Sequence, residues 1–306
     1  MNTLLLIDGN AIMHRVFHAL PPFKTKAGIP TNMIYGFFSM LYKTVSDFKP
    51  THIIVCFDTP KPTFRNKLFK EYQSQRPKVD DDFITQIPLL REALDKSGIV
   101  RLEKDGYEAD DVIGTIAKKA EKESMKVIIL TGDKDILQLV DKNIFLITPQ
   151  TGLNIKLYDE SETKKRMLVE PFEIPDLKAL MGDPSDNYPG AKGIGPKTAT
   201  HLIEQFRTVE HLLSHVSEIK NEKVKKIIES DRDNILLSKK LATIICNVPL
   251  EINLKDSEFT WFKKELEDYF MKLEINSLRK RIFAKTPEPK KIEKKKKTDE
   301  NQIGLF

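Results

Sequence analysis

Nine acidic residues lie at points where the chain is expected to change direction, and oxygen-rich clusters of this kind suit hard divalent cations. Four of them follow short apolar runs, three open the segment "GYEADDVIG", and two lie in "GDPSDNYPG". The set is Asp8, Asp58, Glu108, Asp110, Asp111, Asp133, Asp135, Asp183 and Asp186. Taken singly, each of the last two groups also has an ordinary explanation, because acids favour helix N-termini and "DPSDN" is common turn chemistry.

The elements that must position these acids alternate along the chain. Five apolar runs predict short buried strands, namely "TLLLID", "HIIVCFD", "IVRL", "KVIILTGD" and "IFLIT". Helices are predicted between them, over 31–48, 83–97, 109–123 and 134–140. This alternation predicts an α/β fold with a mostly parallel, doubly wound sheet. The carboxyl ends of parallel strands form one edge of such a sheet, so we expect the acids to converge there.

Carboxylates gathered at one edge would repel one another strongly unless cations lay among them. Mg²⁺, or Mn²⁺ in its place, keeps several waters and takes few direct carboxylates, so nine acids predict two or more ions. Two such ions about 4 Å apart are the usual apparatus for attack of water on a phosphodiester. The acids therefore predict a metal-dependent phosphodiester hydrolase.

A helical region and a charged tail follow the predicted sheet. Strand patterns fade after about residue 171, and helices are predicted over 175–182, 196–206, 208–216, 222–242 and 259–282. From residue 285 the chain is rich in lysine and lacks an apolar period, which predicts a disordered tail. We therefore expect three parts: a catalytic core over 1–170, a helical DNA-binding region over 171–284 and a tail over 285–306.

The composition agrees with a large soluble enzyme. The chain has 306 residues, 40% of them hydrophobic, and a net charge of +5. Its early apolar run stops at Asp8, so neither a signal peptide nor a membrane-spanning segment is expected. These features predict a cytoplasmic, monomeric protein without a membrane partner.

Basic and aromatic residues alternate in the segment 61–78, "KPTFRNKLFKEYQSQRPK". Basic side chains pair with phosphates, and rings such as Phe64, Phe69 and Tyr72 can stack on bases, as in a track for single-stranded nucleic acid. The same pattern also fits a solvated surface helix with a few buried rings.

The stretch "GAKGIGPKTA" follows the last two acids. Gly190 and Gly195 have the separation required in a nucleotide-binding P-loop, but Pro196 stands where that loop needs its lysine, which excludes a P-loop. Between apolar helical segments, the stretch instead has the form of a helix-hairpin-helix turn. Its glycines let the backbone approach a DNA phosphate, and the next helix offers its N-terminal amides. The DNA-binding residues expected here are Lys192, Gly193, Gly195, Lys197 and Thr198.

Six blocks in this order, "LLLIDGNAIMHRVFHAL", "GIPTNMIYGF", "CFDTPKPTFR", "GYEADDVIGTIAKKA", "LTGDKDILQLV" and "GDPSDNYPGAKGIGPKTA", closely resemble the bacterial 5′ nuclease family. This family includes the flap endonuclease and 5′ to 3′ exonuclease module of DNA polymerase I. The resemblance spans about residues 3–282. It implies a PIN-like parallel sheet, a helical arch over about 61–82, and a helix-three-turn-helix element that binds duplex DNA with a potassium ion.

The resemblance also implies roles for individual residues. All nine acids match the metal ligands of the family, with Asp135, Asp183 and Asp186 forming the weaker or second site. The arch, where a flap or 5′ end is thought to thread, maps onto 64–76. Its catalytic residues would be Arg65, Lys70, Tyr72 and Arg76. Gln73 departs from the family because a lysine that acts on the scissile phosphate is usual there, and we expect Lys70 to cover part of its role. His14, where the family commonly has tyrosine, and Arg15 would contact DNA.

The last five residues, "QIGLF", are similar to the bacterial pentapeptide that binds the sliding clamp. The residues at the fixed positions of that pattern are Gln302, Ile303, Leu305 and Phe306. A short apolar anchor on a flexible lysine-rich tether would raise the concentration of the enzyme on DNA. The alternative is an arbitrary disordered terminus.

Together these observations predict a divalent-metal-dependent 5′ nuclease that trims flaps and removes RNA primers. Its substrates would be flap, nicked or gapped duplexes with a 5′ end. Two alternatives stay open. One is a clamp-tethered protein that binds flaps and cuts poorly because of Gln73, and the other is an RNA-cleaving nuclease on a related sheet.

Overall fold

A computed structural model describes residues 2–76, 79–150 and 154–283, and a six-stranded sheet lies at its centre. The strand order is β3-β2-β1-β4-β5-β6. The strands are β1 (Thr3–Asp8), β2 (His52–Cys56), β3 (Val100–Leu102), β4 (Lys126–Leu130), β5 (Ile144–Pro149) and β6 (Ile155–Tyr158). All neighbouring pairs are parallel except β5 and β6. The prediction of a mostly parallel α/β sheet is thus confirmed.

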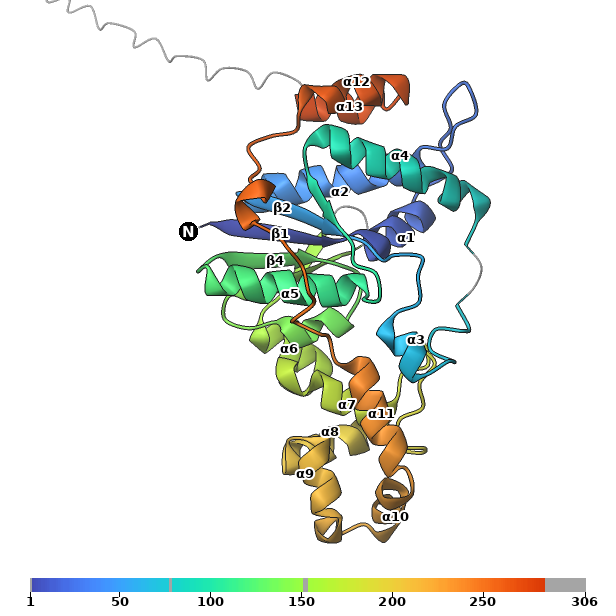
Figure 1. The fold of residues 1–306 in the computed structure, drawn as a ribbon, viewed down its shortest axis with the longest axis vertical. Coiled ribbons are helices and arrows are strands. Elements are labelled where there is room, and N and C mark those ends of the chain that lie inside the picture. The colour runs from blue at the N-terminus through green and yellow to red at the C-terminus, as the bar shows by residue number, and fades with distance from the viewer. Residues whose placement is uncertain (1, 77–78, 151–153, 284–306) are drawn as a thin grey trace, which may run out of the picture.

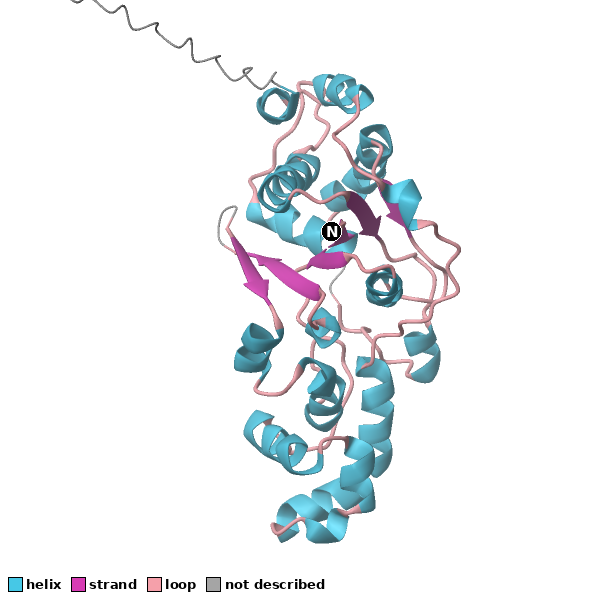
Figure 2. Cartoon of the chain, turned by 90° about the vertical axis from the view of Figure 1, so that its left-hand side faces the viewer, coloured by secondary structure: helices cyan, strands magenta, loops and turns pink. Residues whose placement is uncertain are grey.

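Both faces of the sheet are buried, which explains why its strands are continuous apolar runs. Because successive side chains point to opposite faces, Leu4 and Leu6 join one core cluster, whereas Leu5 and Ile7 join the other. The second cluster contains α1 (Gly9–Ala19), α2 (Asn32–Phe48) and α4 (Asp81–Ser97), and the first contains α5 (Ala109–Lys122) and η1 (Asp135–Leu139). Figure 2 shows the strands between these two helical layers.

A lobe of helices continues from the α5 side of the sheet, at the bottom of Figure 1. It consists of α6 (Glu160–Met167), η2 (Pro171–Glu173), α7 (Ile174–Met181), α8 (Pro196–Phe206), α9 (Val209–Ser214), η3 (Val216–Glu218), α10 (Glu222–Ser230) and α11 (Arg232–Ala242). Most of its buried apolar side chains belong to the same core cluster as Leu4 and Leu6, whereas Leu241 and Ala242 of α11 form a separate cluster with Tyr72 and Tyr188. The lobe is therefore packed against the sheet as a continuation of its core.

The end of the described chain returns to the opposite side of the molecule. After η4 (Leu254–Ser257), helices α12 (Lys264–Lys272) and α13 (Asn276–Phe283) pack on α4 and α2. Figure 1 shows them at the top, far from α8 to α10. The expectation of one helical DNA-binding region over 171–284 therefore needs correction, because this last part completes the sheet core. None of the helices in the described ranges is long and apolar enough to cross a bilayer.

Several elements differ from the sequence-based prediction. Helices α1 and α6 and the edge strand β6 were not predicted. The helix predicted over 222–242 is divided at Asp231, whose carboxylate accepts a hydrogen bond from the backbone of Lys192 at 2.7 Å. The one predicted over 259–282 is divided between α12 and α13. At the first of these breaks the chain makes a contact with a residue distant in sequence, and apolar periodicity does not indicate such contacts.

The segment expected to form a helical arch contains one short helix, α3 (Phe64–Leu68), followed by turns. Thr63 and Asn66 form a capping box that fixes the start of α3. Residues 77–78 lie outside the described ranges, as does the predicted tail over 285–306 with its clamp-binding residues.

Candidate active site

The predicted convergence of acids occurs at the carboxyl edge of the sheet. A cavity of about 380 Å³ lies there, between the ends of β1, β2 and β4, the start of α5 and the segment after α3. Six of the nine predicted acids line it, namely Asp8, Asp58, Glu108, Asp110, Asp133 and Asp186. Their side chains come from segments up to 178 residues apart, because residues 8 and 186 both contribute.

Asp8 is held rigidly because it ends β1 and also caps α1. Its Oδ1 accepts a hydrogen bond from the backbone of Ala11 at 2.9 Å, and its Oδ2 accepts one from the hydroxyl of Thr131 at 2.7 Å. Only 3% of Asp8 is exposed. Capping of this kind turns the end of a buried strand into a fixed carboxylate.

Asp58 and Asp133 are fixed by similar short contacts. Asp58 accepts a hydrogen bond from the backbone of Ala109 at 2.7 Å, and its own backbone donates to the side chain of Asn10. Asp133 accepts from the backbone of Asp135 at 2.8 Å. The carboxylates are thus oriented before any ligand arrives, which favours metal binding.

Burial and mutual repulsion raise the pKa values of these acids. Burial is the largest cause for Asp8 and Glu108, and it raises the pKa of each to about 7. The pKa of Asp110 lies well above its ordinary value, first through burial and then through the nearby charges of Asp133 and Asp8. In the absence of a cation, the cluster therefore retains protons near neutral pH, which a divalent ion would displace.

This electrostatic arrangement predicts an unusual pH dependence of stability. Asp8, Glu108 and Asp135, each with a pKa raised to about 7, bind protons more tightly in the folded than in the unfolded state. Stability contributed by these groups is complete below about pH 4 and is lost as the pH rises through about 7. We expect the free energy of unfolding in EDTA, measured with urea, to fall by at least about 2 kcal/mol between pH 5 and pH 8. Mg²⁺ should remove most of this fall, and a metal-free protein that is more stable at pH 8 would contradict the prediction.

The other predicted metal group forms a second cluster beside the cavity. One carboxylate oxygen from each of Asp135, Asp183 and Asp186 lies within 4.8 Å of the others. The ammonium of Lys178 contacts both Asp135 and Asp183, the latter at 2.5 Å. Burial alone would raise the pKa of Asp183, but Lys178 and Ser185 outweigh it and lower that pKa.

Asp111 does not line the cavity, contrary to its expected role beside Asp110. It is fully buried, and its two oxygens accept hydrogen bonds from the Arg65 guanidinium at 2.7 and 3.0 Å. The backbone amides of Ile245 and Glu108 also donate to it. Adjacent residues on a helix point in directions about 100° apart, and here Asp110 faces the cavity whereas Asp111 faces Arg65.

Arg65 is correspondingly buried, with 2% of its surface exposed, and it has no free face for a DNA phosphate. Besides Asp111, its guanidinium donates to the carbonyls of Leu241 and Thr243 at 2.8 and 2.9 Å. Its expected role on the substrate is therefore replaced in this structure by a structural one, in which α3 is fastened to α5 and to the end of α11.

The rest of the predicted arch lies over the second cluster. The Tyr72 hydroxyl is 3.2 Å from Glu108 Oε2 and 3.1 Å from Asp186 Oδ2. The side chain of Gln73 donates a hydrogen bond to Asp186. Arg76 forms an ion pair with the same carboxylate at 2.9 Å. Lys70 is exposed and is not among the residues that line the cavity, and its expected part in the role of the missing lysine stays a prediction.

His14 and Arg15 lie on α1 beside the cavity. The exposed His14 ring lines the cavity and stacks on Phe83 at 4.4 Å between centroids. Burial and the neighbouring charges of His18 and Arg76 lower its pKa. Arg15 is exposed and donates to the carbonyl of Gln150 at 3.2 Å.

The glycine-rich hairpin has the geometry expected for backbone contacts with an anion. Gly193 has a φ of +96°, which favours glycine, and a side chain at Gly195 would meet open space. Pro196 begins α8, so the following amides of Lys197 and Thr198 face outward without intrahelical partners.

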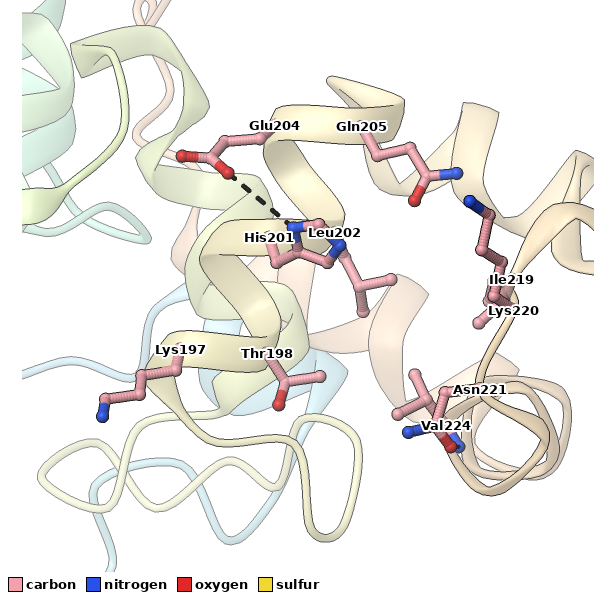
Figure 3. A pocket seen from close by; sticks show the side chains of 10 residues that line it. All are labelled: Lys197, Thr198, His201, Leu202, Glu204, Gln205, Ile219, Lys220, Asn221 and Val224. Atoms are coloured by element: carbon pink, nitrogen blue, oxygen red, sulfur yellow. Dashed lines mark hydrogen bonds and ion pairs between the residues drawn. The ribbon is translucent and has the colours of Figure 1, made fainter.

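A cavity of about 670 Å³ lies next to this hairpin, between α8 and the start of α10. Figure 3 shows Thr198 and Leu202 on the face of α8 that looks toward Ile219 and Val224, whereas Lys197 extends on another side of the helix. Lys197 and Lys220 give the rim positive charge. The hollow and the hairpin together form a candidate nucleic-acid interface.

Three residues of the site were missed by sequence reasoning. Asn10 and Thr131 orient Asp58 and Asp8, and Lys178 joins two acids of the second cluster. Their positions gave some indication, because Asn10 and Thr131 stand at strand ends like the acids themselves. Nothing in the local sequence around Lys178 indicates that contact.

The fold places the chain in a structural class that includes a phage flap endonuclease and the catalytic core of Rad2. The structure is similar to the D15 protein of bacteriophage T5 co-crystallised with metal ions (TM-score 0.69, 17% identity, covering 92% of this chain and 99% of that one). It is also similar to the catalytic core of Rad2 in complex with DNA substrate (TM-score 0.55, 16% identity, 89% and 88% covered). At these identities the likeness shows the fold.

Sequence comparison defines the family. The model of the 5′-3′ exonuclease N-terminal, resolvase-like domain matches residues 3–168, and that of the C-terminal SAM fold matches residues 169–265. The chain belongs to the 5′-3′ exonuclease family. It is 37% identical to the 5′-3′ exonuclease of Aquifex aeolicus, covering 92% of this chain and 96% of that protein. It is 42% identical to the DNA polymerase I of Bacillus subtilis over 91% of this chain, but it spans only about a third of that polymerase.

Proposed function

We propose that this protein is a divalent-metal-dependent 5′ to 3′ exonuclease and flap endonuclease acting on DNA and on RNA primers. The observation that carries the proposal is the cavity lined by six carboxylates at the carboxyl edge of the sheet. Its donors are all oxygens, and several have raised pKa values, as expected of groups arranged for cations. The chain's place in the 5′-3′ exonuclease family supports the same reaction class.

The residues would divide the work as follows. Asp8, Asp58, Glu108, Asp110 and Asp133 would hold the catalytic Mg²⁺ or Mn²⁺ ions, with Asp135, Asp183 and Asp186 as a second group. Two such ions, when bound, activate water for in-line attack on a phosphodiester and stabilise the leaving oxygen. Thr131 and Ala11 keep Asp8 in one orientation, and Ala109 does the same for Asp58. Products with a 5′-phosphate and a 3′-hydroxyl are expected.

The hairpin would hold the duplex through its phosphates. Gly193 and the free amides at the start of α8 suit backbone contacts, which carry no base specificity, and the hairpin would also hold a potassium ion. In the cell we propose a role in lagging-strand replication and repair. Clamp binding through Gln302, Ile303, Leu305 and Phe306, which lie outside the described residues, would belong to that role.

Single-turnover cleavage of a 5′-labelled double-flap DNA in Mg²⁺ tests the proposal. Wild type should cut near the junction, and Asp133→Ala, which removes one cavity carboxylate, should not. An RNA hairpin offered in parallel should be cut poorly. If wild type binds the flap but cuts it in neither Mg²⁺ nor Mn²⁺, the protein is a flap-binding module and the proposed activity is wrong.

Gln73→Lys should accelerate the same single-turnover cleavage. Gln73 lies on the rim of the cavity and donates a hydrogen bond to Asp186, so a lysine there would bring a positive charge within reach of the scissile phosphate. We expect an increase of about tenfold, which is less than the about 100- to 1,000-fold effect of one fully preorganised group that stabilises a transition state. Lys70→Gln, which alters an exposed residue away from the cavity, is the matched control and should change little. A Gln73→Lys rate equal to wild type would show that the lysine is not limiting here.

A further inference from the structure

The second carboxylate cluster already contains cations that belong to the protein. Lys178, in the last turn of α7, contacts Asp135 and Asp183 and is largely buried, with 14% of its side chain exposed. Arg76, from the segment after α3, forms the ion pair with the third member, Asp186. Each carboxylate of the cluster is thus paired with a positive side chain of this chain.

The two cations differ in how firmly they are held. Lys178 lies on a packed helix. Its partner Asp183 accepts hydrogen bonds from the backbone and hydroxyl of Ser185, and its backbone pairs with that of Tyr188 in an isolated β-bridge. Arg76 is more than half exposed, with 56% of its side chain accessible. Arg76 can therefore leave Asp186 and pair with a phosphate of a bound DNA strand. Lys178 cannot move away without breaking its contacts with Asp135 and Asp183.

We propose that Lys178 is a positioning residue that occupies the second cation position of the metal-free enzyme, and that a second ion binds only by displacing its ammonium. This inference rests on the proposed function. One oxygen from each of the three carboxylates lies within 4.8 Å of the others, and the Lys178 ammonium contacts two of these carboxylates, so a divalent ion would compete with it for the same groups. The second ion would then bind weakly until DNA withdraws Arg76 from Asp186 and leaves the cluster with excess negative charge.

Metal binding in the absence of DNA tests this assignment without relying on cleavage. Titration calorimetry with MnCl₂ should show weak binding at the second cluster in wild type and binding about tenfold tighter in Lys178→Met, a modest effect for the removal of one unit charge at this range. Lys178→Arg, which keeps the charge, should remain as weak as wild type. Lys239→Met is the matched control, because Lys239 also joins two acids, Asp176 and Glu210, away from the cavity.

A purely structural role for Lys178 predicts a different result. In that case Lys178→Met would unfold at a lower temperature without gaining affinity for Mn²⁺. If Lys178→Met or Lys178→Gln folds only when Mn²⁺ is added, the further substitution Asp183→Asn should abolish that rescue, since Asp183 belongs to the second cluster and does not line the cavity. Mn²⁺ affinity in Lys178→Met equal to or weaker than in wild type, or a loss of folding that Mn²⁺ does not restore, would overturn it. Because no DNA is present, absence of flap cleavage would count against the proposed function and not against this inference.

Discussion

Replacing Asp110 with asparagine should abolish flap cleavage and at the same time make the metal-free protein more stable. Asp110 lies among Asp8, Asp58, Glu108 and Asp133, and its pKa is raised by burial and by their charges. Among the described residues no basic side chain forms an ion pair with the Asp110 carboxylate. Only a cation bound in the cavity would neutralise its negative charge. An asparagine at this position would no longer repel the neighbouring carboxylates. It would also replace a charged ligand of the proposed metal site with a neutral amide.

We expect a loss in the single-turnover rate of more than about a hundredfold in Mg²⁺, with flap affinity retained. The free energy of unfolding in EDTA at pH 8 should rise by about 1 to 2 kcal/mol. Asp176→Asn is a suitable control, since Asp176 is also a buried acid but accepts hydrogen bonds from Val209 and Lys239 outside the cavity. That variant should lose stability and keep its cleavage rate. Cleavage by Asp110→Asn near the wild-type rate would refute the assignment of Asp110.

Arg65→Ala should destabilise the protein severely and leave the salt dependence of DNA binding unchanged. The substitution would remove the guanidinium that neutralises the fully buried Asp111 and also leave the carbonyls of Leu241 and Thr243 without their donors. Breaking a buried pair by deleting one partner typically costs about 3 to 5 kcal/mol. Urea unfolding in the presence of Mg²⁺ would measure this loss.

The same variant distinguishes a structural from a DNA-contacting role. A phosphate contact made by Arg65 would flatten the slope of log affinity against log salt by about 0.9, and we expect no such change. Arg207→Ala is the matched control: Arg207 pairs with Glu173, but 68% of its side chain is exposed. Its loss should cost less than about 1 kcal/mol. If the Arg65→Ala protein remains folded and its slope is flattened, Arg65 contacts a DNA phosphate and the structural role is wrong.

The sequence was sufficient to predict the five parallel strands and the place where the acids meet, because both follow from simple sequence patterns. Runs such as "LLLI" and "VIIL" are buried strands, and residues after parallel strands share one edge. The direction of each side chain was not predictable in the same way. The string "EADD" shows three acids but not that Asp111 turns inward, since this depends on Arg65, which lies 46 residues earlier.

The remaining differences also arise from contacts between distant segments. The division of the helix predicted over 222–242 follows from the contact between Asp231 and Lys192. Helices α12 and α13 pack on α4 and α2 through complementary apolar faces. Sequence periodicity shows that each helix has an apolar face, but it does not show which faces contact each other. The positions of the nine acids and the family resemblance agreed on the list, but neither distinguished the acids that line the cavity from Asp111, which supports α3.

The position of α12 and α13 has a consequence for biosynthesis. The central strands β1, β2 and β4 are all translated by residue 130, yet the outer side of α2 and α4 is covered only when the helices that end at Phe283 have been made. Roughly 150 residues separate these events, which at ribosomal rates corresponds to on the order of ten seconds. During that interval the nascent chain presents an uncovered apolar layer, and Asp183 and Asp186 join the other acids only in its course. The acidic site and the hydrophobic core of this protein are therefore completed late in synthesis, and a chaperone that shields the outer side of α2 and α4 would act before the acids have all come together.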